Sequence, residues 1–177
     1  LCTSYNSKFI NISSGCIYNG YEKNFTETDE PNNGLTNPDS SWYSKTKHAC
    51  ELALKNYSGA FNFRIRMPVT GKISESKNYL TKILKYNNLI NFKNSKTIVN
   101  DLLGFVSYFI RRDEITGGFP SGNYNVVNPN PLDTKQIVSI LDDFNLWNPN
   151  WKWINLEKLY ESTACKRSNC VLDASYA

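Results

Sequence analysis

The chain has 177 residues, of which 40% are hydrophobic and 20% charged, a composition typical of a globular domain rather than of a disordered or fibrous segment. Its net charge of +4 is spread along the sequence, with Lys and Arg interspersed among Asp and Glu. This pattern favours a pocket for one anionic ligand over a nucleic-acid surface. The longest apolar run, residues 102–110, falls short of the roughly 20 residues that cross a bilayer, so membrane insertion is not expected.

The five cysteines are an odd number, in a chain large enough to fold without disulfide bonds. We therefore expect free thiols and a cytoplasmic location. Cys165 and Cys170 form the single close pair and His48 is the only histidine, so we expect no metal site. The sequence begins at Leu1 and its only methionine is Met67, from which we expect the chain to be a fragment of a longer protein.

The first third of the chain predicts a strand, a long loop, a helix and a second strand. The run at 8–13 is short, apolar and β-branched, and it leads into a loop. Residues 19–41 are rich in Asn, Pro, Gly, Asp and Ser, which indicates a long surface loop of the kind that often lies near a functional site. Helical spacing of apolar residues follows over 41–57, and residues 61–67 alternate with a period of two before Pro68. Together these segments predict a βαβ unit.

Helices and strands continue to alternate in the rest of the chain. The apolar pattern predicts helices over 78–86 and 101–112 and a short strand over 124–127. Asp133 precedes a further predicted helix, which continues through Phe144. The fold class is therefore α/β. The glycine-rich turn G-x-G-x-x-G, which opens a dinucleotide-binding fold, does not occur in the sequence.

Tyr43 and Lys47 are four residues apart at the start of a predicted helix, which puts a phenol and an ammonium on the same face. An ammonium stabilises a nearby phenolate, so this pair is suited to proton transfer. The pattern alone is weak, since most such pairs are solvated helix surface. His48 lies on a different face of the helix, where we expect a structural or solvated side chain.

Three blocks in this order carry a family resemblance: Asn11 to Tyr18, Tyr43 to Lys47, and Arg64 to Val69. They resemble the extended short-chain dehydrogenase/reductases that act on nucleotide sugars. With residues 78–82, 167–169 and 172–175, they are most similar to one subgroup, the bifunctional UDP-4-keto-6-deoxyglucose 3,5-epimerase/4-reductases of UDP-rhamnose synthesis in plants and large DNA viruses. The resemblance implies the C-terminal part of a Rossmann-like fold, a parallel sheet with flanking helices plus a small substrate-binding region, without the N-terminal glycine-rich βαβ portion.

The resemblance assigns a reductase site to the first part of the chain. Ser14 would hydrogen-bond the C4 carbonyl of the sugar, and Tyr43 would donate the proton. Lys47 would hold the nicotinamide ribose, and NADPH or NADH would lie over the backbone of Met67 to Val69, so that Tyr43, Lys47, Met67 and Val69 form the cofactor contacts.

The resemblance also assigns an epimerase pair. Inversion at C3 and C5 needs a base and an acid on opposite faces of the sugar ring, and Cys16 and Lys82 match the catalytic cysteine and lysine of the subgroup. Without this role, Cys16 is a small buried hydrophobe and Lys82 is solvated helix surface. Cys16 therefore separates an epimerase-reductase from a plain reductase.

The substrate contacts follow in the second part of the chain. Arg167 resembles the arginine that grips the nucleotide diphosphate, and Asn78 would contact the nucleotide or pyrophosphate. We expect residues 1–70 to be the remainder of the dinucleotide-binding domain. Residues 71–177 would be mainly nucleotide-sugar-binding, with segments returning to the core.

The expected substrate is UDP-4-keto-6-deoxyglucose and the expected location is cytoplasmic, in the host cytoplasm for a viral protein. The alternatives are a plain dTDP-4-keto-rhamnose-type reductase and a non-catalytic regulatory subunit of the same fold. The sequence leaves a homodimer open, and we expect the isolated 177 residues to be inactive and not to bind NADPH.

Overall fold

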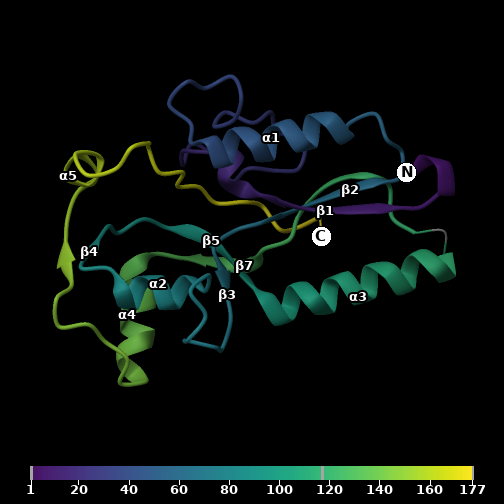
Figure 1. Cartoon of the computed structure of the whole chain (residues 1–177). Coiled ribbons are helices and arrows are strands. Elements are labelled where there is room, and N and C mark those ends of the chain that lie inside the picture. The colour runs from purple at the N-terminus through teal and green to yellow at the C-terminus, as the bar shows by residue number, and fades with distance from the viewer. Residues whose placement is uncertain (1, 117, 177) are drawn as a thin grey trace.

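A computed structural model describes residues 2–116 and 118–176 and has a three-stranded parallel sheet at its centre (Figure 1). Its strands are β1 (Phe9–Ser14), β2 (Ala60–Ile65) and β6 (Gly122–Asn125), in the order β1-β2-β6. Phe9 pairs with Ala60, and Phe61 pairs with Gly122. The parallel pairing of β1 and β2 around an intervening helix confirms the predicted βαβ unit.

Two helices cover opposite faces of this sheet. Helix α1 (Trp42–Leu54) lies on one side and the long helix α3 (Val99–Thr116) on the other (Figure 1). Aromatic side chains fill the space under α3, where Phe109 packs edge-on against Phe61 and Phe63 at centroid distances of 4.9 and 5.0 Å. Apolar rings of this size contribute much of the burial energy of a domain, so this face holds the main apolar core.

The period-two pattern of residues 61–67 describes β2 correctly, but the strand ends at Ile65. The peptide N–H of Arg66 leaves the sheet and donates to the Thr97 hydroxyl at 3.0 Å, and Met67 has a positive φ of 40°. The polar members of the pattern, Asn62 and Arg64, are buried under α1. Both faces of β2 are therefore covered.

A second group of strands continues from the first sheet. Strands β3 (Pro68–Val69), β5 (Asn94–Ile98) and β7 (Asn128–Leu132) form the order β3-β5-β7, with β3 and β5 parallel and β5 and β7 antiparallel. Strands β4 (Asn88–Leu89) and β8 (Lys152–Trp153) form a short parallel pair. The sequence analysis predicted none of these five strands, because they are short or carry polar residues.

The remaining helices are short. They are α2 (Tyr79–Lys85), α4 (Thr134–Asp143) and α5 (Leu156–Tyr160), with 3-10 turns η1 (Thr3–Tyr5) and η2 (Gly15–Ile17). Asp133 caps α4 as predicted, in a reciprocal capping box with Gln136. Helices α2 and α4 share a small apolar core that includes Ile83 and Ile137.

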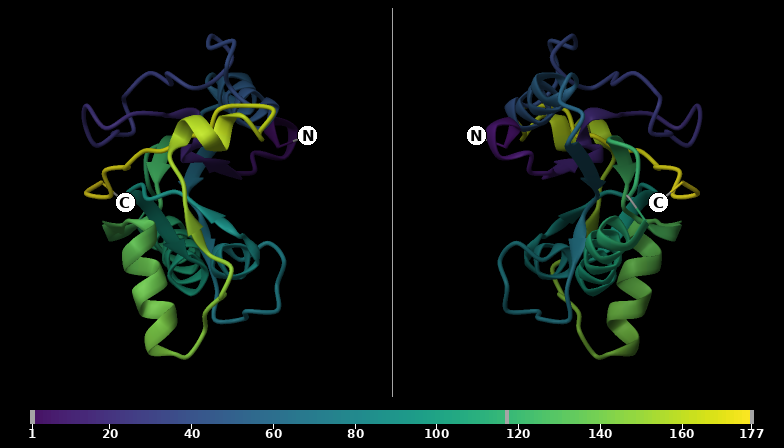
Figure 2. Two further views of the ribbon diagram at one scale, coloured as in Figure 1. Left: turned by 90° about the vertical axis from the view of Figure 1, so that its left-hand side faces the viewer. Right: turned by 90° about the vertical axis from the view of Figure 1, so that its right-hand side faces the viewer.

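The predicted long loop runs between η2 and α1 on the same side of the molecule as α1 (Figure 2). The C-terminal segment packs against it: Phe25 forms a parallel bridge with Leu172, and the ring of Phe25 stacks on Tyr18 at 4.5 Å. Residues from the two ends of the sequence thus share one buried cluster beside η2. No helix among the described residues is long and apolar enough to cross a membrane.

Candidate active site

Ser14 and Cys16 lie where β1 ends and turns into η2. Ser14 is 4% exposed, and its hydroxyl accepts a hydrogen bond from the peptide N–H of Cys16 at 3.2 Å. Gly15 between them permits a close approach, because a Cβ there would lie 2.7 Å from Cδ1 of Leu172. The turn therefore fixes the hydroxyl and the thiol at the carboxyl end of a parallel strand, where α/β folds place their sites.

Tyr43 and Lys47 lie on the first turns of α1, which Ser41 caps by accepting from the N–H of Ser44 at 3.1 Å. The Lys47 ammonium donates to the carbonyl of Ile12 at 2.7 Å and lies 5.8 Å from the centroid of the Tyr43 ring. Ile12 precedes Ser14 by two residues in β1. The structure therefore brings this helix face to the strand end that carries the serine.

Tyr43 is half exposed, at 53% of its surface, and no hydrogen bond engages its hydroxyl within residues 2–116 and 118–176. His48 is buried, and its Nδ1 accepts from the peptide N–H of Leu35 at 3.2 Å. The expectation of a structural histidine is confirmed. The phenol is thus open to a substrate, while the histidine is committed to the long loop.

A buried ion pair supports this part of the fold. Arg64 on β2 donates from Nη2 to Oε2 of Glu51 on α1 at 2.7 Å, and both side chains are almost completely buried. Ser13 donates to the same carboxylate at 2.5 Å, and Tyr18 accepts from Arg64 Nη1 at 2.9 Å. Burial raises the pKa of the Tyr18 phenol, which stays protonated. The sequence analysis did not identify this network, although two arginines in an apolar strand are a signal for buried cations.

Arg66 forms a second buried centre directly beside Cys16. Its Nη1 donates to the Cys16 Sγ at 3.0 Å, and its Nη2 donates to Asn94 Oδ1 at 2.7 Å and to the Ser168 carbonyl at 2.5 Å. Arg66 is 1% exposed. This contact was also missed by sequence reasoning, because its members are separated by 28 to 102 residues.

The predicted cofactor stretch follows Arg66. Met67, Pro68 and Val69 are half-buried, and Pro68 and Val69 pair with Thr97 and Ile98 of β5. The positive φ of Met67 marks the point where the chain leaves one sheet and joins the next. This backbone lies between the two strand groups.

Asn78, which was predicted to touch the substrate, is used within the chain. It is 2% exposed, caps α2 by accepting from the N–H of Leu80, and donates to the carbonyls of Thr70 and Lys72. The structure thus gives its side chain a role in fixing the loop before α2. A contact with the nucleotide stays a prediction.

Lys82 and Arg167 are both exposed, Lys82 on α2 and Arg167 in the C-terminal segment. Burial raises the pKa of Tyr79 on α2, while the charges of Arg66 and Arg167 act in the opposite direction. Lys96 on β5 is 6% exposed, and its ammonium lies 5.2 Å from the centroid of the Tyr79 ring. Burial lowers the pKa of Lys96 to about 7. Tyr79 therefore lies beside the Lys96 side chain and within the field of the two arginines.

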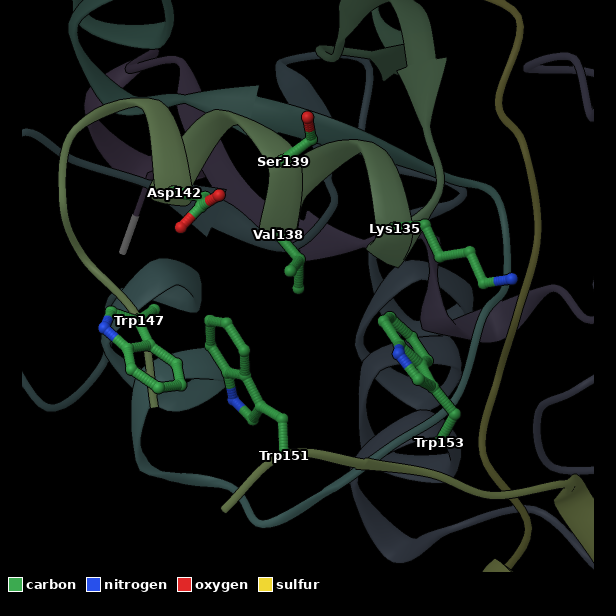
Figure 3. A pocket seen from close by; sticks show the side chains of 7 residues that line it. All are labelled: Lys135, Val138, Ser139, Asp142, Trp147, Trp151 and Trp153. Carbon is green, nitrogen blue, oxygen red and sulfur yellow. The ribbon is translucent and has the colours of Figure 1, made fainter. Parts of the chain in front are cut away.

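A separate pocket of about 380 Å³ lies between α4 and a tryptophan-rich segment (Figure 3). Trp147, Trp151 and Trp153 face Lys135, Val138, Ser139 and Asp142 of the helix. Trp151 donates from its indole N–H to the Ile83 carbonyl at 2.9 Å, and the Lys135 ammonium lies 5.7 Å from the Trp153 centroid. None of the predicted site residues lines this pocket.

The expectation of free thiols agrees with the structure. All five cysteines are free. Within the part of the chain that the structure describes, no three His, Cys, Asp or Glu side chains form a group that could hold a metal ion.

The chain is similar in sequence to known proteins. No protein-family model matches the chain. It is 32% identical, over 99% of its length, to the trifunctional UDP-glucose 4,6-dehydratase/UDP-4-keto-6-deoxy-D-glucose 3,5-epimerase/UDP-4-keto-L-rhamnose-reductase of Arabidopsis thaliana, of which it covers 26%. It is also 32% identical to the bifunctional dTDP-4-dehydrorhamnose 3,5-epimerase/dTDP-4-dehydrorhamnose reductase of the same plant, of which it covers 57%. The chain thus spans between a quarter and about half of the length of these relatives.

The chain is also similar to solved structures. The L780 UDP-rhamnose synthase of Acanthamoeba polyphaga mimivirus superposes with a TM-score of 0.80 and 28% identity, over 97% of this chain and 58% of the viral one. A dTDP-4-dehydrorhamnose reductase of Bacillus anthracis, in complex with NADP, has a TM-score of 0.74 at 17% identity, over 96% of this chain and 58% of that one. The first expectation from the three sequence blocks is confirmed: the chain is a homologue of the epimerase/reductases of nucleotide-linked rhamnose synthesis and has the α/β fold of the extended short-chain dehydrogenase/reductases.

Proposed function

We propose that the whole protein is an NAD(P)H-dependent 3,5-epimerase/4-reductase that converts UDP-4-keto-6-deoxyglucose to UDP-L-rhamnose. The observation that carries the proposal is the arrangement at the end of β1. Ser14 and Cys16 lie there on either side of Gly15, and Lys47 binds the carbonyl of Ile12 in β1. A hydroxyl, a thiol and a Tyr-Lys pair then serve two reactions in one site.

Reduction uses Ser14, Tyr43 and Lys47. Ser14 donates a hydrogen bond to the C4 carbonyl, and the half-exposed Tyr43 hydroxyl protonates the developing alkoxide. Lys47 uses one of its three N–H groups on Ile12, which leaves two for ribose hydroxyls and places its charge beside Tyr43.

The residues present fit the nicotinamide end of a dinucleotide. NADPH or NADH supplies the hydride when bound, as the NADP complex of the structurally similar Bacillus anthracis reductase suggests. Met67 and Val69 are only half-buried, and their backbone borders the end of β2. We assign the nicotinamide contacts to this backbone together with Tyr43 and Lys47.

Epimerisation uses Cys16 and Lys82. The C4 ketone acidifies the hydrogens at C3 and C5, so a thiolate is a competent base and an ammonium a competent acid. Cys16 is half-buried and Lys82 is exposed, so both can meet a sugar that lies between β1 and α2. A plain reductase has no need of either group.

The substrate's nucleotide diphosphate is assigned to the second part of the chain. Arg167 is exposed, and its guanidinium fork suits phosphate oxygens, so we assign it to the diphosphate. We propose residues 1–70 as the remainder of the dinucleotide-binding domain and residues 71–177 as mainly the nucleotide-sugar region, with segments that return to the core and with Asn78 as a contact of the nucleotide or pyrophosphate. The five free cysteines support a cytoplasmic location, and a homodimer without nucleic-acid or membrane partners stays a prediction.

The test separates the two reactions in the full-length protein. The substrate UDP-4-keto-6-deoxyglucose is incubated with NADPH in D₂O, and NMR reports deuterium at C3 and C5 while absorbance reports NADPH oxidation. Cys16→Ser should lose about 10²–10⁴-fold in deuterium uptake and keep hydride transfer, because a weakly acidic hydroxyl replaces the base. Lys82→Met should fail to complete the inversion, since reprotonation from the opposite face is lost.

Lys85→Met is the matched control, because Lys85 is also exposed on α2. It should behave like the wild type. Rhamnose formation at the wild-type rate by both Cys16→Ser and Lys82→Met would remove these two residues from the epimerase role. NADPH oxidation by the wild type without deuterium uptake at C3 and C5 would make the protein a plain reductase. No NADPH oxidation by the wild type would favour a non-catalytic subunit.

A further inference from the structure

Arg66 is a buried cation without a carboxylate partner. Within the described residues its acceptors are the Cys16 sulfur, the Asn94 side-chain oxygen and the Ser168 carbonyl, and its Nε has no partner. Arg64, two residues earlier, has the carboxylate of Glu51. The two arginines therefore differ in what balances their charge.

A buried charge without a counter-charge is costly, and arginine does not lose its proton in proteins. Among the acceptors of Arg66, the Cys16 thiol alone can become an anion, at a distance of 3.0 Å from Nη1. Asn94 and Ser168 offer only neutral oxygens. The charge of Arg66 therefore acts on one ionisable partner.

The neighbouring titratable groups do not supply the missing negative charge. Those that act on Arg66 or on its thiol neighbours are Cys170, Tyr21, Tyr79, Lys96 and Glu22. Burial raises the pKa of the Cys170 thiol, which donates to the Gly15 carbonyl at 3.4 Å, and raises that of Tyr21 to about 12. Burial also raises the pKa of the Tyr79 phenol. Lys96 is a base and has no anionic form, and the Glu22 carboxylate is exposed rather than buried beside Arg66.

We propose that Arg66 is the positioning residue that holds Cys16 as a thiolate, aimed at the sugar from the turn after β1. This inference rests on the proposed epimerase function and adds the group that activates its base. The substrate's phosphates cannot take the place of the thiolate, because Arg66 is 1% exposed. Arginine next to a cysteine is a known cause of thiolate formation.

The proton transfers of the proposed epimerisation step balance. The Cys16 sulfur takes the proton from C3 or C5, an S–H bond forms as the C–H bond breaks, and the electron pair moves into the enolate at C4. The Lys82 ammonium returns a proton to the opposite face. Exchange with water restores the thiolate and the ammonium, and carries deuterium into the product in D₂O.

The test measures the thiolate directly. The full-length protein is treated briefly with iodoacetamide between pH 6 and pH 9, and peptide mass spectrometry reports the alkylation rate of each cysteine. An unassisted thiol, with a pKa near 8.5, gains on the order of 100-fold in rate over this range. Cys16 should give a much flatter profile than this, because the charge of Arg66 next to its sulfur stabilises the thiolate. The exposed Cys50 is the internal reference.

Variants assign the effect to Arg66. Arg66→Met should give Cys16 the steep profile of an unassisted thiol, and Arg66→Lys should retain part of the flat profile because it keeps the charge without the planar fork. Arg111→Met, at an exposed arginine of α3, is the matched control and should leave the profile flat. Circular dichroism checks that each variant is folded, and if Arg66→Met is not, the wild type and Arg66→Lys decide.

A steep Cys16 profile in the wild type would overturn the proposal, as would a flat profile that persists in folded Arg66→Met. A flat wild-type profile without deuterium uptake at C3 and C5 would overturn the epimerase function while leaving the action of Arg66 on Cys16 in place. Failure of the two proposals is therefore distinguishable.

Discussion

Tyr43 is the residue on which reduction depends most directly, because the proposed mechanism has no other proton donor for the C4 oxygen. Its hydroxyl is open, and the Lys47 ammonium lies 5.8 Å from its ring centroid. We expect Tyr43→Phe to lower kcat for NADPH oxidation about 10²–10⁴-fold while exchange at C3 and C5 partly persists. Tyr5→Phe, at a tyrosine that is 75% exposed, is the control. Reduction near the wild-type rate would remove Tyr43 from the mechanism.

Lys96 predicts a pH dependence of stability. Its ammonium donates to the carbonyls of Asn94 and Leu132 at 2.8 and 2.9 Å, and burial lowers its pKa from 10.5 to about 7. Between these values the unfolded chain binds more protons than the folded chain, so this group makes the free energy of unfolding rise with pH. Below pH 7 both states carry the proton and the contribution is constant.

The Lys96→Met variant removes this dependence. We expect the difference in free energy of unfolding, variant minus wild type, to fall as the pH rises from 7 to 10, measured by urea denaturation. Lys93→Met, at an exposed lysine just before β5, should show no such trend. A difference for Lys96→Met that is independent of pH would show that Lys96 carries its proton equally in both states.

At the scale of residues, the sequence indicated which side chains belong to the candidate site but not which residues they contact. Ser14, Tyr43 and Lys47 lie in recognisable blocks. In the structure, Ser14 ends β1, Lys47 binds the Ile12 carbonyl of that strand, and the Tyr43 ring lies 5.8 Å from the Lys47 ammonium. The contact of Arg66 with Cys16 joins positions 50 residues apart, and such pairs follow only from tertiary packing. In the sequence, the signal for these buried arginines is their alternation with apolar residues over 61–67.

At the scale of elements, the Glu51–Arg64 ion pair joins α1 to β2. The Glu51 carboxylate also accepts a hydrogen bond from the Ser13 hydroxyl on β1. Glu51→Gln leaves a buried guanidinium without its counter-charge, so we expect the free energy of unfolding to fall by about 3–5 kcal/mol in urea denaturation. Glu75→Gln, which breaks the exposed pair with Lys72, should cost no more than about 1 kcal/mol. Equal effects of the two substitutions would show that the buried pair does not stabilise this joint.

Hydrophobic pattern predicted the elements that bury apolar faces. The strands over 8–13, 61–67 and 124–127 and the four helices all appear, with ends shifted by a few residues. Strand β5 was missed because its sequence Asn-Ser-Lys-Thr-Ile lacks apolar alternation, and β7 contains two prolines. Four of the five residues of β5 are buried through contacts with distant segments, and these contacts decide its conformation.

At the scale of the whole molecule, the C-terminal segment returns to the turn after β1. Ser168 donates to the Tyr18 carbonyl at 2.6 Å, and Cys170 and Leu172 join the cluster of Ile17 and Phe25. The proposed base, its arginine and the segment that buries them thus come from three parts of the sequence.

The most direct test of this account is the product that the full-length protein forms from UDP-4-keto-6-deoxyglucose and NADPH in D₂O. We predict UDP-L-rhamnose with deuterium at both C3 and C5, seen by NMR, and one NADPH oxidised per product molecule. A reduced 6-deoxyhexose without deuterium at these carbons would contradict the bifunctional assignment.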